Sequence, residues 1–210
     1  MKVLLINGSP HEHGCTYTAL KEIADTLAAE GIESEIMHVG LEPIRGCTGC
    51  GTCIRQKTGR CVFGGDPVNA ALEKMQECDG LIVGSPVHYA SAGGAVTAML
   101  DRMFYAGSAS MRGKPGAAVC SARRAGTTAT LDQLNKYFII SGMPLVPSQY
   151  WPMVHGSTPE QVAQDEEGLQ IMRMLGRNMA WMLKSFALAA EQGILPPERE
   201  AKRKWTNFIR

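Results

Sequence analysis

The sequence lacks long apolar runs and lacks an excess of charge of either sign. None of its apolar runs reaches about 18 residues, the length that a helix needs to cross a bilayer. Lys and Arg together number 21 and Asp and Glu number 20, so the net charge is +1. Such a balance gives no general attraction to nucleic acids or acidic membranes. We therefore expect a protein that has neither a nucleic-acid nor a membrane partner.

The N-terminus also lacks the pattern of a secretory signal. Residues 1–6 contain only a short apolar run, which ends at Asn7-Gly8 and lacks the charged-then-apolar length of a signal peptide. The seven cysteines are an odd number, and without a signal peptide they do not predict a disulfide framework. We expect a cytoplasmic protein with reduced cysteines.

The composition and the periodicity are those of a globular α/β domain. With 210 residues, 45% of them hydrophobic, the chain is long enough for one domain with its own core. The predicted strands cover residues 3–6, 34–39, 81–83, 117–120 and 145–150. The predicted helices cover residues 16–30 and 66–78, the segments around 96–103 and 131–138, and about 161–191. Strands that alternate with helices predict a five-stranded, doubly wound parallel sheet with helices on both faces, in a domain of residues 1–193 with an extension at 194–210.

Residues 8–18 join the first predicted strand to the first predicted helix. This loop contains neither G-x-G-x-x-G nor G-x-x-x-x-G-K-[ST], so it carries neither a dinucleotide fingerprint nor a triphosphate loop. It has hydroxyl side chains in front of a helix N-terminus, whose free amides and dipole favour a phosphate. The alternative is a plain connecting loop with a capping hydroxyl.

Two further loops follow predicted strands. Residues 84–91 contain His88 and Tyr89, whose flat side chains suit a stacked planar ring, and residues 121–128 contain several hydrogen-bond donors. Each segment alone is equally typical of a solvated surface loop. Because the carboxyl ends of parallel strands share one edge of the sheet, we expect all three loops to meet at one crevice.

Four short motifs occur in order along the chain: Gly8-Ser9-Pro10 with Gly14-x-Thr16, Gly84-Ser85-Pro86-Val87, Leu100-Asp101-Arg102 and Ser141-Gly142-Met143. Together they resemble the flavodoxin-like NAD(P)H-dependent FMN reductases, over roughly residues 1–190. Within that family, Cys47-x-x-Cys50-x-x-Cys53 followed by Cys61 is similar to the compact cysteine motif of the iron–sulfur flavoproteins.

The resemblance implies a flavodoxin-like fold, FMN as cofactor and NAD(P)H as transient electron donor. For the FMN phosphate it implies Ser9, His11, Cys15, Thr16, Tyr17 and Thr18. For the ribityl chain and ring it implies Pro86, Val87, His88, Tyr89 and Ser91. For the pyrimidine edge of the ring it implies Ser121, Ala122, Arg123, Arg124, Gly126 and Thr127.

The sequence departs from the family at three places in these loops. His11 replaces a basic residue, Cys15 replaces a frequent Asn, and Ser121-Ala122 replace paired glycines. These departures weaken the expectation for the phosphate and for the pyrimidine edge. Arg123 or Arg124 would compensate by bringing positive charge near the reduced flavin.

Cys47, Cys50, Cys53 and Cys61 lie within 15 residues of one another. Neighbouring glycines free the backbone, so that one loop can present three thiolates and Cys61 can return as the fourth ligand of a [4Fe–4S] cluster. Two alternatives stay open: reduced cysteines without a metal, and zinc or redox-active thiols.

Three functions fit this reading. The first is an FMN oxidoreductase that passes electrons from NAD(P)H to a small-molecule or protein acceptor, with no catalytic residue named because the flavin carries the chemistry. The second is an iron–sulfur flavoprotein that carries electrons between protein partners, and the third is a binding protein without turnover. We also expect a homo-oligomer, a dimer or a tetramer, because Trp205, Phe208 and Ile209 lie in a tail too short to form a core.

Overall fold

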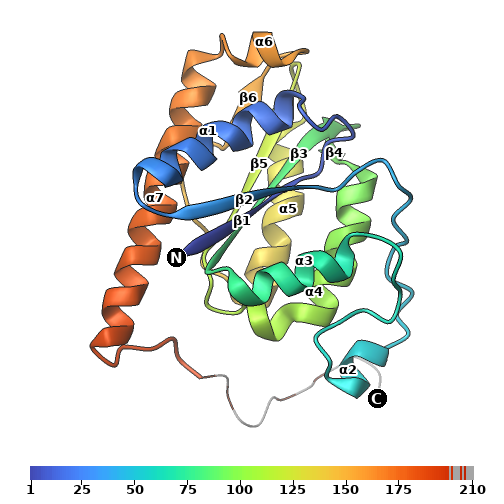
Figure 1. Cartoon of the computed structure of the whole chain (residues 1–210). Coiled ribbons are helices and arrows are strands. Elements are labelled where there is room, and N and C mark those ends of the chain that lie inside the picture. The colour runs from blue at the N-terminus through green and yellow to red at the C-terminus, as the bar shows by residue number, and fades with distance from the viewer. Residues whose placement is uncertain (199, 201–203, 205, 207–210) are drawn as a thin grey trace.

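The computed structural model describes residues 1–198, 200, 204 and 206, and Figure 1 shows how its elements are layered. The strands are β1 (Lys2–Asn7), β2 (Glu33–His38), β3 (Gly80–His88), β4 (Ser91–Ala92), β5 (Gly116–Ala122) and β6 (Met153–His155). They form one sheet in the order β2-β1-β3-β5-β6, and β4 pairs with β3 beside this path. All pairs along the path are parallel, so the predicted doubly wound parallel sheet is confirmed.

Helices cover both faces of the sheet (Figure 1). They are α1 (Cys15–Ala29), α2 (Thr52–Gln56), α3 (Val68–Glu77), α4 (Gly94–Met111), α5 (Thr127–Ser141), α6 (Pro159–Val162) and α7 (Glu166–Glu191). Successive strand residues point to opposite faces, so Leu5 packs in a core with Ile23 of α1, whereas Leu4 packs in a second core with Leu72 of α3. The central strands β1, β3 and β5 are therefore buried along most of their length, as a sheet covered on both faces requires, whereas the edge strand β2 has no buried residue.

The third strand is longer than the sequence predicts. We expected a strand at 81–83 and a loop from Gly84, but β3 continues to His88 because Gly84, Ser85 and Pro86 pair with β5. A two-residue turn at Tyr89–Ala90 then leads into β4, which pairs antiparallel with the end of β3. Most of the second predicted loop is thus a β-hairpin that projects from the sheet.

The fifth strand was predicted in the wrong place. In the segment 145–150, only Leu145 forms a bridge, with Gly116, and the chain rejoins the edge of β5 at β6, after Pro152. Pro147 has no amide hydrogen to donate, so the edge strand is interrupted there. The loop that follows β6, residues 156–158, therefore lies at the carboxyl edge of the sheet.

The predicted helical region at 161–191 consists of two helices. α6 is a single short turn of helix, and α7 begins after Asp165, whose side chain accepts a hydrogen bond from the Gly168 amide at 3.0 Å. Within the described residues, no helix combines the length and the apolarity that a membrane crossing needs. The boundary at residue 193 stays a prediction, and Trp205, Phe208 and Ile209 lie outside the described residues.

Candidate functional site

The loop after β1 is shaped by a side chain that the sequence analysis did not select. Asn7 is fully buried; its amide donates to the Glu12 carbonyl at 2.9 Å and its oxygen accepts from the Ser9 amide at 3.2 Å. Ser9 is also buried, and its hydroxyl accepts from the His11 amide at 3.1 Å. Gly8 passes so close to the next helix that a Cβ there would lie 2.7 Å from Val96 Cβ. Hydrogen bonds and close packing within the chain therefore fix the shape of the loop.

The loop ends at the N-terminus of α1. Thr18 donates its amide to the Gly14 carbonyl at 3.0 Å, so the amides of Cys15, Thr16 and Tyr17 precede the first turn of hydrogen bonds and point out of the helix. The start of the helix borders a hollow, which is lined by Pro10, His11, Glu12, His13, Gly14, Cys15, His38, Leu41, Ser157 and Pro159. Three amides at the positive end of a 15-residue helix form a site suited to a phosphate.

The hollow includes residues that the sequence analysis missed. Ser157 follows β6, and the thiol of Cys15 lies 3.7 Å from the Gly156 carbonyl, so this loop closes one side. His38 closes another side, with its Nε2 atom 2.8 Å from the Ser9 carbonyl. Ser157 was not predicted because the fifth strand was placed too early in the sequence. His38 could have been predicted from its position at the end of β2.

Thr16 has a different contact from the one expected. Its side chain is 1% exposed, and its hydroxyl lies 2.9 Å from the hydroxyl of Ser121, at the end of β5. This hydrogen bond joins the first loop to the third. As placed, the Thr16 side chain fixes the start of α1 against the end of β5 and does not line the hollow.

The hairpin after β3 holds unusual backbone angles. Tyr89 and Ala90 have φ values of 48° and 57°, in the left-handed region that favours glycine or asparagine. The Tyr89 side chain is fully exposed at the tip. Because such angles cost about 1–2 kcal/mol for an ordinary residue, surrounding contacts must hold the turn in this shape.

Gly126 supplies one of these contacts. A Cβ at Gly126 would lie 2.8 Å from both Ala90 Cα and Val87 Cγ1, and its φ of 92° also requires glycine. The hairpin and the loop before α5 are thus packed against each other. The structure therefore brings all three predicted loops to one edge of the sheet, the carboxyl ends of β1, β3 and β5.

The predicted flavin residues differ in exposure. Ser9, Thr16, Ser121 and Ala122 are buried. His11, His88, Tyr89, Arg123 and Arg124 are exposed. Cys15, Tyr17, Thr18, Pro86, Val87, Ser91, Gly126 and Thr127 are partly buried. The first group supports the loops, and the other two groups supply the surface that a ligand can touch.

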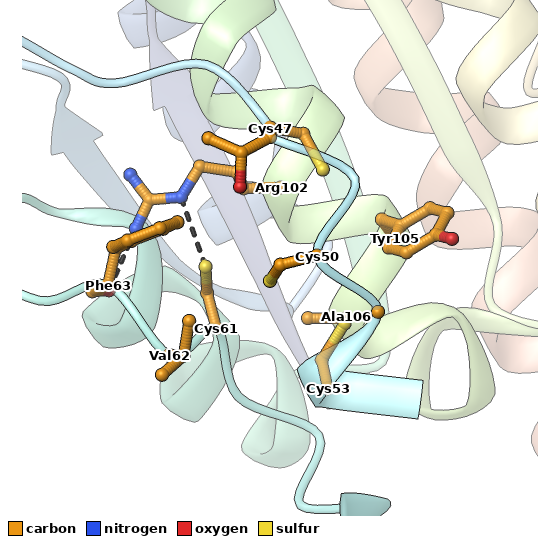
Figure 2. Close-up of a pocket in the computed structure, with 11 residues that line it drawn as sticks. Cys47, Cys50, Cys53, Cys61, Val62, Phe63, Arg102, Tyr105 and Ala106 are labelled. Carbon is orange, nitrogen blue, oxygen red and sulfur yellow. Dashed lines mark hydrogen bonds between the residues drawn. The ribbon is translucent and has the colours of Figure 1, made fainter. Parts of the chain in front are cut away.

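The four clustered cysteines surround one pocket beside α4 (Figure 2). Cys47, Cys50 and Cys53 come from the loop before α2 and from α2 itself, and Cys61 comes from the opposite side. Cys47 and Cys50 are exposed, whereas Cys53 and Cys61 are partly buried. Hydrogen bonds at its sulfur from Thr52 lower the pKa of the Cys50 thiol.

Within the described ranges, no three His, Cys, Asp or Glu side chains are close enough to bind one metal ion. A single ion draws its ligands around one point, whereas the four thiolates of a cubane each bind a different iron and lie farther apart. Four thiols spread around one pocket fit the donor set of the larger group. The remaining cysteines are elsewhere; burial raises the pKa of Cys120 to about 12, which keeps that thiol protonated and inert.

One helix lies beside both regions. Val96, in the first turns of α4, packs against Gly8 of the loop after β1, and Arg102 of the same helix lines the cysteine pocket. These residues are six positions apart, about 9 Å along a helix axis. The two candidate sites are thus neighbours on one rigid element.

Comparison with known proteins agrees with this arrangement. The profile of the family described as NADPH-dependent FMN reductase matches residues 1–158. An iron–sulfur flavoprotein of Methanocaldococcus jannaschii is 32% identical over 198 residues, which are 88% of this chain and 98% of that protein.

Two solved structures have a similar fold. One is a flavodoxin from the domain Archaea, with a TM-score of 0.59 and 15% identity over 88% of this chain and 99% of that one. The other is the apo form of an NADH:FMN oxidoreductase, with a TM-score of 0.63 and 18% identity over 86% of this chain and 89% of that one. At these identities the likeness shows the fold alone, which is flavodoxin-like. Because the family profile covers most of its length, the chain belongs to the NADPH-dependent FMN reductase family.

Proposed function

We propose that this protein binds FMN at the carboxyl edge of β1, β3 and β5 and transfers electrons from NAD(P)H to an acceptor. The observation that carries the proposal is the hollow at the N-terminus of α1, which the loop after β1 surrounds and which Gly14 and Cys15 of the helix start line. The family to which the chain belongs and the name of its NADH:FMN oxidoreductase neighbour support the same ligand.

In this proposal the chain binds and orients the cofactor. The amides of Cys15, Thr16 and Tyr17 hold the phosphate, with hydroxyls of the same loop around it. The hairpin 86–91 lies along the ribityl chain and ring, and residues 121–127 meet the pyrimidine edge. Arg123 and Arg124 are exposed there and bring positive charge to the side of the ring that becomes negative on reduction.

When bound, FMN supplies the chemistry, because it accepts a hydride from NAD(P)H and releases the electrons to an acceptor. The chain needs no acid–base pair for this transfer, and we assign it no catalytic residue. The fully exposed ring of Tyr89 leaves the hairpin tip open to solvent, so a nicotinamide or an acceptor can approach from that side.

We also propose a [4Fe–4S] cluster on Cys47, Cys50, Cys53 and Cys61. Its support is the convergence of four thiols on one pocket and the name of the iron–sulfur flavoprotein relative. A second candidate function follows from it: the protein carries electrons between protein partners. The exposure of Cys47 and Cys50 favours this candidate, because a partner protein can come close to the pocket.

We further propose a homo-oligomer, a dimer or a tetramer. On α5, Ile139 and Ile140 are 63% and 83% exposed, and they line a groove with Tyr137. Adjacent apolar side chains of this size favour contact with another surface. Sedimentation of the intact protein tests this proposal: a multiple of 22.7 kDa supports it, and a monomer at micromolar concentration contradicts it.

The experiment that tests the main proposal is purification without air, followed by absorption spectroscopy and extraction of the cofactor. FMN in near-equal amount to the chain is expected, and FAD or colourless protein would contradict the proposal. Mixing with NADH, NADPH or a reduced ferredoxin then separates the two functions. Rapid bleaching by a nicotinamide supports the reductase, and reduction by the ferredoxin alone supports the carrier.

A further inference from the structure

We propose that Arg102 is a positioning residue of the cysteine pocket. It closes the segment 45–66 around the four thiols, and its hydrogen bond to Cys61 raises the reduction potential of a cluster bound there. The part of the inference that concerns the potential rests on the cluster proposed above. The part that concerns closure of the segment does not.

The first observation is the burial of a full positive charge. The side chain of Arg102 is 1% exposed, and that of its ion-pair partner Asp66 is 6% exposed. A buried ion pair stabilises a fold only weakly, so an apolar residue at this position of α4 would give similar stability. The position of Arg102 therefore calls for a role beyond packing.

The second observation is what the guanidinium binds. Nε donates to Cys61 Sγ at 3.2 Å, Nη2 donates to the Phe63 carbonyl at 2.8 Å, and Nη1 donates to the Arg45 carbonyl at 3.2 Å and to Asp66 (Figure 2 shows the bonds to Cys61 and Phe63). All four partners lie on the cysteine segment, outside α4.

The positions of these partners along the sequence explain how Arg102 closes the segment 45–66. Arg45 precedes Cys47 by two residues, and Phe63 and Asp66 follow Cys61 by two and five residues. One side chain thus ties the start of the segment to its end, and all four cysteines lie between the two ties. The Phe63 ring adds a contact, since the Arg45 guanidinium lies 4.8 Å from its centroid.

The bond to Cys61 gives the arginine an electronic role. Reduction adds negative charge to a cluster, and an N–H donor at a ligand sulfur stabilises that charge, so the potential rises. The planar guanidinium reaches the sulfur, two carbonyls and a carboxylate at once. The point charge of a lysine keeps the positive charge but cannot reproduce this fork.

The test compares Arg102→Lys and Asp66→Asn after anaerobic reconstitution with iron and sulfide, by potentiometric titration. Arg102→Lys loses the Nε donor. The equilibrium constant for reduction of the cluster is therefore expected to fall about tenfold, which lowers the potential by about 59 mV for one electron. Asp66→Asn removes a negative charge and keeps the donor, so its potential is expected to rise. Simple loosening of the segment would move both variants in the same direction and would overturn the electronic role.

The matched control is Arg55→Lys. Arg55 lies on the same segment and donates to the Cys50 carbonyl at 2.9 Å, a backbone oxygen. Its conservative replacement is expected to leave the potential within measurement error. A fall equal to that of Arg102→Lys would contradict the assignment of the effect to the thiol bond.

Closure of the segment is measured separately, by the rate of backbone amide hydrogen exchange in residues 45–66 of the iron-free protein. In Arg102→Lys these amides are expected to exchange at least tenfold faster than in the wild type, whereas the exchange rates of α1 and β1 should not change. Equal exchange would overturn closure. If the wild type takes up no iron, the cluster proposal and the electronic role both fail, and faster exchange in the variant still supports closure.

Discussion

The loop after β1, residues 8–14, and the cysteine segment, residues 45–66, differ in what holds them in place. The loop after β1 is anchored by a buried strand, by the buried side chains of Asn7 and Ser9, and by glycines packed against neighbouring elements. The segment 45–66 contains one five-residue helix, α2, and leaves Cys47 and Cys50 exposed. A single buried arginine ties its ends together.

This contrast separates two ways of making a site. The topology of the sheet brings the three loops together at one edge whether or not a ligand is bound, because each loop follows a strand with fixed register. No strand positions the cysteine segment, so its geometry depends on side chains and on whatever the thiols bind. Substitutions in the first region should therefore change affinity gradually, whereas those in the second should remove binding altogether.

The largest expected effect is in the cysteine segment. Cys50→Ala should reduce the iron content of reconstituted protein from about four atoms per chain to nearly none. FMN content should stay unchanged, because Cys50 is exposed and its replacement disturbs no core. Iron analysis and flavin absorbance on the same sample measure both. Thr48→Ala, beside the same pocket, is the matched control and should retain its iron; loss of FMN together with iron would contradict the independence of the two sites.

A difference in thiol reactivity is the next largest effect. In iron-free protein, Cys50 is exposed with a lowered pKa, whereas Cys120 is buried with a pKa raised to about 12. Alkylation at pH 8 should therefore be roughly 100-fold faster at Cys50. Peptide mass spectrometry after timed quenching gives both rates. Similar rates would mean that the core around β5 opens as readily as the cysteine segment.

The same contrast explains what the sequence could predict. Apolar runs such as residues 3–6 and the helix stops at Gly31 and Gly142 depend on local chemistry, and the structure confirms both glycines at positive φ. The convergence of three loops followed from the alternation of strands and helices. These features need only short-range patterns and the rules of a parallel sheet.

Other features depend on partners far away in the chain. The fifth strand was misplaced because residues 145–150 have the apolar pattern of a strand, and only the pairing of β5 shows that Met153–His155 take that position. Arg102 entered the sequence analysis as part of a motif, but nothing local indicates that it faces Cys61, 41 residues away. Asn7 was taken as a strand boundary, and its fold-back to Glu12 appears only in three dimensions.

The hydroxyl of Thr16 is expected to have an intermediate effect. Thr16→Val keeps the shape but leaves the Ser121 hydroxyl without its partner, so the free energy of unfolding should fall by about 1–3 kcal/mol. FMN affinity should fall by roughly two- to tenfold, the value of one neutral hydrogen bond, because the lost bond fixes the start of α1 beside the proposed phosphate position. Thr16→Ser restores a hydroxyl and serves as the control in both titrations. A loss of stability with unchanged FMN affinity would show that the hydroxyl supports the fold alone.

The smallest expected effect concerns the two exposed arginines after β5. If Arg123 and Arg124 face the reduced ring, replacing both with alanine removes positive charge there and should lower the flavin potential. Exposed charges contribute about 0.2–1 kcal/mol, which corresponds to roughly 5–20 mV for a two-electron couple. The shift should shrink in about 1 M salt, where the screening length is about 3 Å.

Lys136→Ala is the control for this prediction. It removes a positive charge nine residues beyond Thr127, about 14 Å along α5, and should have no effect on the flavin potential. A shift that salt leaves intact, or one that Lys136→Ala reproduces, would mean that the two arginines do not lie near the ring.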